Sequence, residues 1–401
     1  MNRTGLLRVV LGVSLAALLG GCGVSKWVGV GGEPVVAGDH FTAPNPGRGV
    51  GLRKVWKESL SAAAKGVLPH PGRIVVTGDR VYVATAEEGG LFSSATRGMV
   101  NCLEVGSGRV IWRADLPGAA SGGVAVDENL VYVGTLDGDV VALRRDKGEL
   151  AWKTRVSTKV TSAPAVARDR LLVTTLDSRT YALNTADGSR VWIHASTPES
   201  LVLMGGATPT VVGDTAFVGY PSGEVFALGT ADGKVRWTAN LTAIGGRSEV
   251  DLLQDVDASI VLSSRKIFAV NHQGHVAALF PPTGARVWER RASAIRSPLL
   301  LGRRLIVADV EGNVLALDAE DGGLIWQNRV SDGLLTAPVL LGEQVLIGDN
   351  RGRLMTLDPA SGRVTGLDQV DEELLADPVV TERGLLLWTN RGNLIRYESG
   401  S

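Results

Sequence analysis

Short apolar runs alternate with polar, Gly-rich turns along most of the chain, and one spacing recurs among them. A leucine is followed by a glycine five residues later and by a tryptophan four residues after that. The intact copies are Leu103/Gly108/Trp112, Leu143/Gly148/Trp152, Leu183/Gly188/Trp192, Leu228/Gly233/Trp237, Leu279/Gly284/Trp288 and Leu317/Gly322/Trp326. A further copy, Leu357/Gly362, carries Gly366 in place of the tryptophan. A spacing repeated this often indicates a repeat architecture.

One repeat, residues 162–194, contains four short runs of strand-forming residues: APAV, RLLVTT, TYALN and RVWIH. The turn sequences A-R-D, L-D-S and T-A-D-G separate them, and no helical period survives between these breakers. Four antiparallel strands in about forty residues are typical of a propeller blade. The glycine then closes the turn between the third and fourth strands, where positive φ favours Gly. The tryptophan on the fourth strand can cover the neighbouring blade and donate its indole N–H.

The two ends of the chain complete one another in this scheme. Third strands are predicted near residues 99–104, 139–144, 179–184, 224–229, 275–280, 313–318, 353–358 and 393–398, and the last has no fourth strand after it. At the other end, residues 54–58 (K-V-W-K-E) read as a fourth strand without three before it. We therefore predict an all-β fold, an eight-bladed β-propeller of four-stranded antiparallel blades over residues 51–401. The N-terminal strand would close the ring by completing the last blade, which removes an open sheet edge.

The N-terminus is typical of a bacterial lipoprotein signal. Arg3 and Arg8 form a positive n-region before an apolar run of residues 9–19, which is too short to span a bilayer. The run ends in L-G-G-C, which resembles a lipobox, so residues 1–21 are predicted to be a signal peptide and Cys22 to be lipidated. An ordinary signal peptide with a chance Cys is the alternative. Residues 22–50, rich in Gly and Pro, are predicted to be a flexible tether. By resemblance to lipoprotein sorting in Gram-negative bacteria, Gly23 after the Cys favours release to the inner leaflet of the outer membrane.

Composition narrows the functional classes further. Lys and Arg number 41 against 42 Asp and Glu, which argues against a nucleic-acid-binding surface. Cys102 is the only other cysteine and takes the place of alanine in sister repeats. We interpret it as a small buried residue, with a reactive thiol as the alternative.

Departures from the repeat are concentrated on one expected face of the ring. The loop at residues 85–98 is long, and so are the connections after Trp56, Trp192 and Trp237. Because strands alternate in direction within a blade, all four insertions should lie on the same face. Two of them, residues 196–206 and 240–257, flank the fourth blade. Arg179 is expected on the opposite face, which carries only short turns.

The two insertions beside the fourth blade carry the candidate binding residues. Residues 196–206 place Leu201, Leu203 and Met204 in a loop, where exposed apolar groups suggest a protein contact. Alternatively, this loop folds back and plugs the ring. Residues 240–257 are acidic, with Glu249, Asp251, Asp255 and Asp257, and a solvated loop is the alternative there. Together the loops would offer an apolar patch with a negative rim, suited to a partner with a basic rim.

The tandem L-x4-G-x3-W blades resemble the pyrroloquinoline-quinone-type propeller repeat. With the lipobox, the eight blades and the sequence S-E-V-D-L-L-Q-D-V-D, the chain resembles the BamB family, lipoproteins of the β-barrel assembly machinery. The resemblance implies a non-enzymatic periplasmic scaffold that binds BamA, and through it the rest of the Bam complex, and that aids outer-membrane protein insertion. Unfolded outer-membrane proteins are a further partner to consider. The implied contacts map onto Leu201, Leu203, Asp255 and Asp257, whereas Met204 stands where the family commonly has Arg.

Other classes of function remain open on the sequence. A quinone-dependent dehydrogenase shares the eight-bladed ring but needs a Ca²⁺ site of oxygen ligands beside the quinone. The known enzymes of this class resemble longer chains in which adjacent cysteines line the quinone site. This chain has no adjacent cysteines and little insertion to build a central pocket, so no cofactor is expected. His272 and His275 have the spacing of two metal ligands but straddle a turn, and surface turn residues are the preferred interpretation. A lipid-anchored propeller that binds peptidoglycan or another envelope partner is the third possibility.

Overall fold

The computed structural model describes residues 41–60, 73–87, 97–160, 162–197, 207–241, 260–271, 275–374 and 376–400. The chain divides into two units, Met1–Phe41 and Thr42–Ser401, and the propeller is the second. All regular structure in the described residues is β-strand. Among these residues, no helix is long and apolar enough to cross a membrane.

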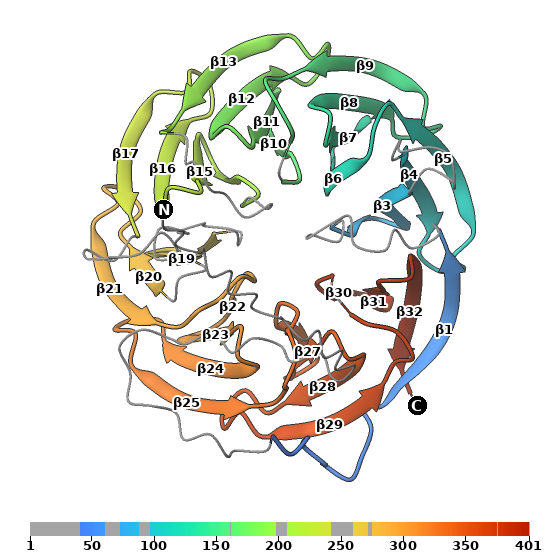
Figure 1. Cartoon of the computed structure of the whole chain (residues 1–401), viewed down its shortest axis with the longest axis vertical. Coiled ribbons are helices and arrows are strands. Elements are labelled where there is room, and N and C mark those ends of the chain that lie inside the picture. Colours follow the sequence, from blue (N-terminus) through green and yellow to red (C-terminus); the bar gives the residue numbers. More distant parts are fainter. Residues whose placement is uncertain are drawn as a thin grey trace, which may run out of the picture. The chain divides into compact units, whose positions relative to one another are not determined.

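The strands form eight four-stranded antiparallel sheets arranged in a ring (Figure 1). Blade 1 consists of β2 (Val75–Thr77), β3 (Arg80–Glu87), β4 (Arg97–Glu104) and β5 (Val110–Leu116). Blade 2 consists of β6 (Ala120–Val126), β7 (Leu130–Thr135), β8 (Asp139–Arg144) and β9 (Leu150–Arg155). Blade 3 consists of β10 (Ala165–Ala167), β11 (Arg170–Thr175), β12 (Arg179–Asn184) and β13 (Arg190–Ala195). Blade 4 consists of β14 (Thr210–Val212), β15 (Thr215–Gly219), β16 (Glu224–Gly229) and β17 (Val235–Asn240).

The second half of the ring follows the same order. Blade 5 consists of β18 (Val261–Leu262), β19 (Ile267–Asn271), β20 (His275–Leu279) and β21 (Arg286–Arg291). Blade 6 consists of β22 (Leu299–Leu301), β23 (Arg304–Ala308), β24 (Asn313–Asp318) and β25 (Leu324–Arg329). Blade 7 consists of β26 (Val339–Leu341), β27 (Gln344–Gly348), β28 (Arg353–Leu357) and β29 (Val364–Gln369). Blade 8 consists of β30 (Val379–Thr381), β31 (Gly384–Trp388), β32 (Asn393–Ser399) and β1 (Leu52–Ser59).

The predicted closure of the ring is confirmed. The N-terminal strand β1 pairs antiparallel with the C-terminal strand β32, from Leu52 opposite Ser399 to Ser59 opposite Asn393. The last blade is thus built from both ends of the chain (Figure 1). No blade in the described ring is left with an unpaired third strand. Joining the termini in this way avoids an open sheet edge with unpaired backbone N–H and C=O groups.

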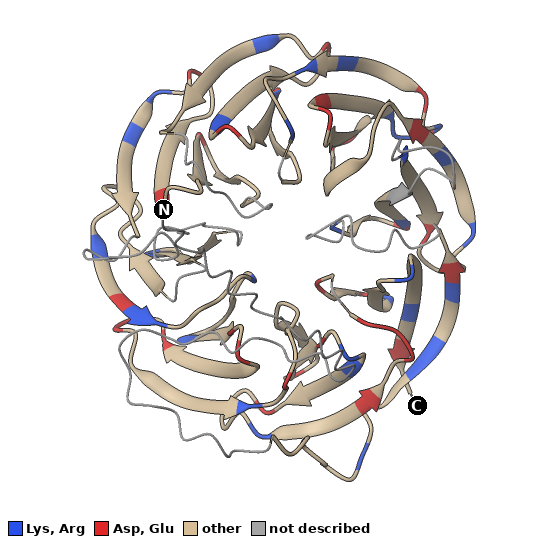
Figure 2. Cartoon of the chain, in the orientation of Figure 1, with Lys and Arg blue, Asp and Glu red and all other residues tan. Residues whose placement is uncertain are grey.

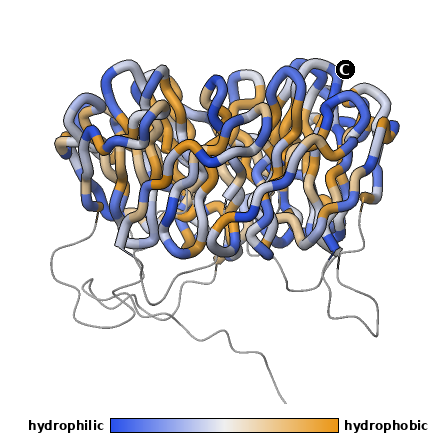
Figure 3. Tube along the Cα trace, turned by 90° about the horizontal axis from the view of Figure 1, so that it is seen from above, coloured by the Kyte–Doolittle hydropathy of each residue, from blue (hydrophilic) through white to orange (hydrophobic). Residues whose placement is uncertain are grey.

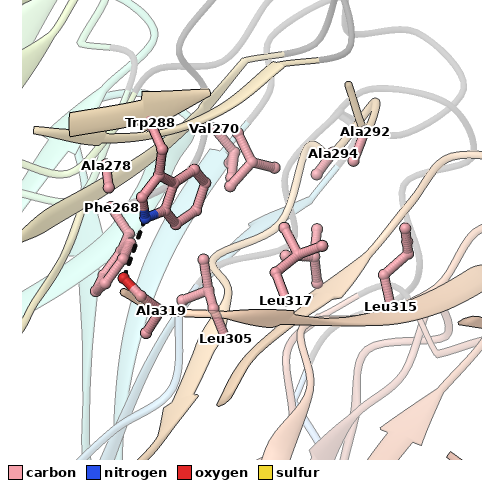
Figure 4. Packing of buried hydrophobic residues seen from close by; sticks show 12 residues of the cluster. Phe268, Val270, Ala278, Trp288, Ala292, Ala294, Leu305, Leu315, Leu317 and Ala319 are labelled. Atoms are coloured by element: carbon pink, nitrogen blue, oxygen red, sulfur yellow. Dashed lines mark hydrogen bonds between the residues drawn. The ribbon is translucent and has the colours of Figure 1, made fainter. Parts of the chain in front are cut away.

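The hydrophobic core lies between adjacent blades, because each blade has apolar residues on both faces. Between blades 5 and 6, for example, Phe268 and Trp288 pack against Leu305 and Leu317 (Figure 4). Alanine on the third strand, such as Ala278 in this cluster, leaves room for the tryptophan opposite it. Seen from the side, the apolar strands lie between two more hydrophilic rims of turns and loops (Figure 3).

The repeat tryptophans join each blade to the next, as predicted. In each case the indole N–H donates to a backbone carbonyl at the turn between the third and fourth strands of the next blade, over distances of 2.7–3.1 Å. Trp288 Nε1, for instance, donates to Ala319 O at 3.1 Å (Figure 4). The tryptophans concerned are Trp56, Trp112, Trp152, Trp192, Trp237, Trp288 and Trp326.

Blade 1 departs from the sequence-based expectation in one respect. Residues 85–98 were expected to be a loop, but the hairpin continues, with Thr85 opposite Met99 and Glu87 opposite Arg97. Part of the extra length therefore extends the strands, because paired backbone groups satisfy one another's hydrogen bonds. Cys102, on β4, is fully buried, as predicted, and burial raises the pKa of its thiol to about 11.

Candidate functional site

The candidate binding residues belong to connections on one face of the ring, here called the insertion face. It is the face at which second strands end, third strands begin and fourth strands end, as the antiparallel order of each blade requires. The partner-binding candidates Leu201, Leu203, Met204, Asp255 and Asp257 lie outside the described residues, as does Cys22. Their positions therefore remain predictions, whereas the bases of both loops are described.

The base of the first loop is held to blade 4 by a carboxylate. Glu224, the first residue of β16, accepts hydrogen bonds from Ser196 Oγ at 2.8 Å and from Ser222 Oγ at 2.9 Å. The Ser196 backbone N–H donates to Ser178 O at 2.9 Å. On the return side, Ala207 is buried. The chain on both sides of residues 198–206 is thus held against the ring.

The base of the second loop is equally well held. Leu241, just after β17, is buried, and its N–H donates to Gly223 O at 2.9 Å. Asn271 Nδ2 in turn donates to Leu241 O at 3.1 Å. On the return side, Thr210 Oγ1 of blade 4 donates to Ile260 O at 3.0 Å. The chain therefore leads from the first loop into blade 4 and from blade 4 into the second loop, and the described bases of the two loops both contact blade 4.

An aromatic cluster lies beside the base of the first loop. The ring of His194, at the end of β13, lies 4.7 Å from that of Phe226 and 6.0 Å from that of Tyr220. Tyr220 is buried, and its hydroxyl is 2.6 Å from Thr180 Oγ1. Burial lowers the pKa of His194, while the nearby Glu224 opposes this shift. These residues fill the junction between blades 3 and 4 beside the base of the first loop.

Two expectations about individual residues are wrong. Arg179 was expected on the face with short turns, but it begins β12 opposite Ala195, at the insertion face, and pairs with Asp177 at 3.2 Å. His275 was interpreted as a surface turn residue, but its side chain is only 14 % exposed, with Nδ1 2.5 Å from Glu289 Oε1. In both cases the third strand begins at the residue itself, so cross-strand pairing places the side chain.

The described residues contain neither a candidate metal site nor a strongly basic surface. No group of three or more His, Cys, Asp or Glu side chains among them could hold a metal ion. His272 lies outside the described residues. Basic and acidic residues alternate around the described ring, so no single sector is strongly basic (Figure 2). This arrangement agrees with the balanced composition and offers no extended phosphate-binding surface.

Comparison with known proteins identifies the family. The family model described as outer membrane protein assembly factor BamB matches residues 96–303 and 273–394. The BamB of Pseudomonas aeruginosa is 44% identical over 243 residues, 61% of each chain. The BamB of Xanthomonas campestris is 37% identical over 214 residues, 51% of this chain and 52% of that protein. The matched regions thus span about half to three fifths of these relatives.

Solved structures agree on the fold. The crystal structure of BamB from Moraxella catarrhalis superposes with a TM-score of 0.76 at 21% identity, covering 86% of this chain and 99% of that one. The quinohemoprotein alcohol dehydrogenase of Comamonas testosteroni also superposes, with a TM-score of 0.68 at 14% identity, covering 89% and 78%. At such identities these likenesses show the ring alone. The family match over most of the blades carries more weight, and this chain belongs to the BamB family of outer membrane protein assembly factors.

Proposed function

We propose that this protein is a non-enzymatic scaffold lipoprotein that assists the assembly and insertion of outer-membrane β-barrel proteins by binding BamA. It would act on the periplasmic side of the outer membrane, held there by lipid on Cys22. The observation that carries the proposal is that both long connections beside blade 4 are rooted on one face, in a chain of the BamB family. A rigid base under each loop lowers the entropy lost on binding.

The two loops would divide the work of recognition between them. Leu201, Leu203 and Met204 in the first loop would supply the apolar centre of the contact. Asp255 and Asp257 in the second would supply an acidic rim that meets basic residues of BamA and favours the correct orientation. Because Met204 stands where the family commonly has Arg, this interface would rely more on apolar contact at that point.

Site-specific photo-crosslinking in cells tests this proposal directly. A photoreactive residue at position 203 should yield an adduct with BamA, identified by mass spectrometry. The matched control is position 189, because Ser189 is exposed in the turn before β13, on the face opposite the insertion face. An adduct at position 203 and none at 189 supports the scaffold. A different envelope protein captured at 203 would instead favour a lipid-anchored propeller with another partner.

Separate measurements address the remaining alternatives. Substituting Leu203 or Asp257 should weaken BamA binding without lowering the thermal stability, because the sequence predicts both in loops between the blades. Dye-linked alcohol oxidation after addition of quinone and Ca²⁺ would overturn the non-enzymatic assignment. Binding of unfolded outer-membrane proteins to the purified ring, measured without BamA, would show whether clients contact this chain directly.

A further inference from the structure

At one junction in the ring the tryptophan contact between adjacent blades is missing. In blade 7 the position of the tryptophan on β29 is occupied by Gly366. The next blade offers no turn for a tryptophan to cover, because its third and fourth strands, β32 and β1, come from opposite ends of the chain. Both halves of this contact are therefore missing at the junction between blade 7 and the closing blade 8.

Residues 48–51 lie at this junction instead. The Leu367 N–H on β29 donates to Arg48 O at 3.1 Å, and Arg48 Nε donates to Thr365 O at 2.5 Å. A Cβ placed on Gly366 would be 2.8 Å from Gly49 O, so the backbone of this segment passes directly over the glycine. The segment runs along the outer side of β29 before it enters β1 (Figure 1). At the far end, the Gly400 N–H donates to Gly51 O at 2.7 Å.

Side-chain burial agrees with a docked segment. Val364 is 9% exposed, and Val110 at the same place in blade 1 is half-buried, whereas three apolar residues at that place on other outer strands, two positions after the turn glycine, are well exposed. Those residues are Leu150 at 62%, Val235 at 47% and Leu324 at 57%. Val50 and Leu52 also pack against a cluster that joins Leu354 of blade 7 to Ile395 of blade 8.

We propose that residues 48–51 are a clasp, which binds the outer edge of blade 7 in place of the repeat tryptophan and seals the ring beside its closing blade. The outer edge of β29 is thus an intramolecular docking site whose occupant is the end of the chain's own tether. The glycines suit this role, because Gly366 leaves space for a backbone and Gly49 lies close to Asp368. As a consequence, the tether leaves the ring at blade 7, and a pull on the tether acts first on the clasp.

The clasp does not depend on the identity of the partner. Its link to the membrane rests on the proposed lipidation of Cys22, whereas docking on β29 is a property of the ring itself. A failure of the crosslinking experiment at position 203 would therefore leave the clasp standing, and a failure of the clasp would leave the partner-binding loops standing.

Hydrogen exchange on the mature full-length protein tests the clasp. The amide of Leu367 should exchange more slowly than that of Gln327, by about tenfold or more. Gln327 holds the same position on the outer strand β25 of blade 6.

The double variant Arg48→Ser/Val50→Ser removes the guanidinium contact and the apolar contact of the clasp. In this variant the Leu367 amide should exchange as fast as that of Gln327, and exchange in β1 and β32 should rise before exchange in the other blades. The control Thr42→Ser/Ala43→Ser changes two exposed tether residues and should match the unmodified protein.

Two results would overturn the proposal. Equal exchange of Leu367 and Gln327 in the unmodified protein would show that the segment is not docked. A faster Leu367 amide in the double variant, with β1 and β32 unchanged, would show a surface contact that does not seal the ring. Tryptic cleavage after Arg48 provides an independent readout of docking, because a docked segment resists the protease. It should be slow in the unmodified protein and fast in the single variant Val50→Ser, which loses the apolar contact of the clasp but keeps the cleavage site after Arg48.

Discussion

The indole of Trp152 lies directly over Gly188 of the next blade. Trp152 Nε1 donates to Thr185 O at 2.8 Å, and a Cβ on Gly188 would come within 2.4 Å of the indole atom Cε3. Gly188 also has a φ of +71°, which disfavours any other residue. The glycine and the tryptophan of the repeat are therefore two halves of one contact between blades, and the spacing along the chain records a contact across the junction.

Replacing Gly188 by Ala should destabilise the protein by about 3 kcal/mol, the sum of left-handed backbone strain and a collision with Trp152. The matched control is Gly213→Ala, because Gly213 has a φ of +61° but a Cβ added there would meet nothing within 4 Å. The control should lose only about 1 kcal/mol. Chemical denaturation of both variants gives the two free energies of unfolding, and equal losses would contradict the role assigned to Trp152.

The closing blade should be sensitive to acid because of Glu372. Its buried carboxylate accepts hydrogen bonds from Lys57 Nζ of β1 at 2.5 Å, from Asn393 Nδ2 of β32 at 2.8 Å and from the Thr389 hydroxyl. Burial alone would raise the pKa of Glu372, but these hydrogen bonds lower it from 4.5 to about 2. The stabilisation is then complete above pH 4.5 and is lost as the pH falls from 4.5 towards 2.

The variant Glu372→Gln tests this acid sensitivity. It should lose about 2 kcal/mol at neutral pH, because Lys57 loses a charged acceptor. It should also show a smaller decrease in stability between pH 5 and pH 3, about the range in which the carboxylates of unfolded chains gain protons. Thermal unfolding followed as a function of pH provides both quantities. An unchanged acid dependence would show that Glu372 does not control the closing blade.

Blade 3 contains a strained position that substitution should relieve. Ser178 has a φ of +56° at a turn where sister blades have Gly138, Gly223, Gly312 and Gly352. Its hydroxyl is buried and has no hydrogen-bond partner. We expect Ser178→Gly to stabilise the protein by about 1 kcal/mol, since it removes both the strain and the unsatisfied hydroxyl. Differential scanning calorimetry should show a raised Tm, and a lowered Tm would mean that the lost side-chain packing outweighs the strain.

The thiol of Cys102 should be unreactive in the folded protein. It is fully buried, and burial raises its pKa to about 11, so the reactive thiolate is scarce at neutral pH. A thiol reagent at pH 8 should therefore label Cys102 only after denaturant unfolds blade 1. In the mature lipoprotein the Cys22 sulfur is expected to carry lipid, so the measurement reports on Cys102 alone. Rapid labelling of the folded protein would favour a reactive thiol.

Much of the fold follows from local signals in the sequence. The residues R-L-L-V-T-T were predicted to be a strand and form β11 at Arg170–Thr175. The adjacent apolar positions and turn glycines locate such strands because backbone geometry and burial are decided within a few residues. The loop at residues 85–98 was misjudged, since an extended hairpin and a loop have the same length along the chain. Arg179 was assigned to the wrong face. It is the first residue of the third strand of its blade, and third strands begin at the insertion face.

The candidate binding site was predicted only as far as its two loops. The sequence marks them as insertions with apolar and acidic residues, but the roles of Leu203 and Asp257 depend on a partner that the chain alone does not specify. What the structure adds is their support, such as the bond from Asn271 to Leu241. That bond joins residues 30 positions apart, and neither residue belongs to the Leu/Gly/Trp motif of the repeat.

The sequence by itself determined the number of blades and the closure of the ring by both termini, because both follow from the repeated motif. It also indicated the family, through the lipobox and the acidic loop sequence together with the eight blades. Only the tertiary structure decided what fills the one incomplete junction. Gly366 reads along the chain as a degenerate tryptophan position, yet Gly49, more than three hundred residues away, passes over it. The physical reason is that a missing side chain leaves a gap whose occupant is selected by proximity in space, and proximity in space exists only after the ring has closed.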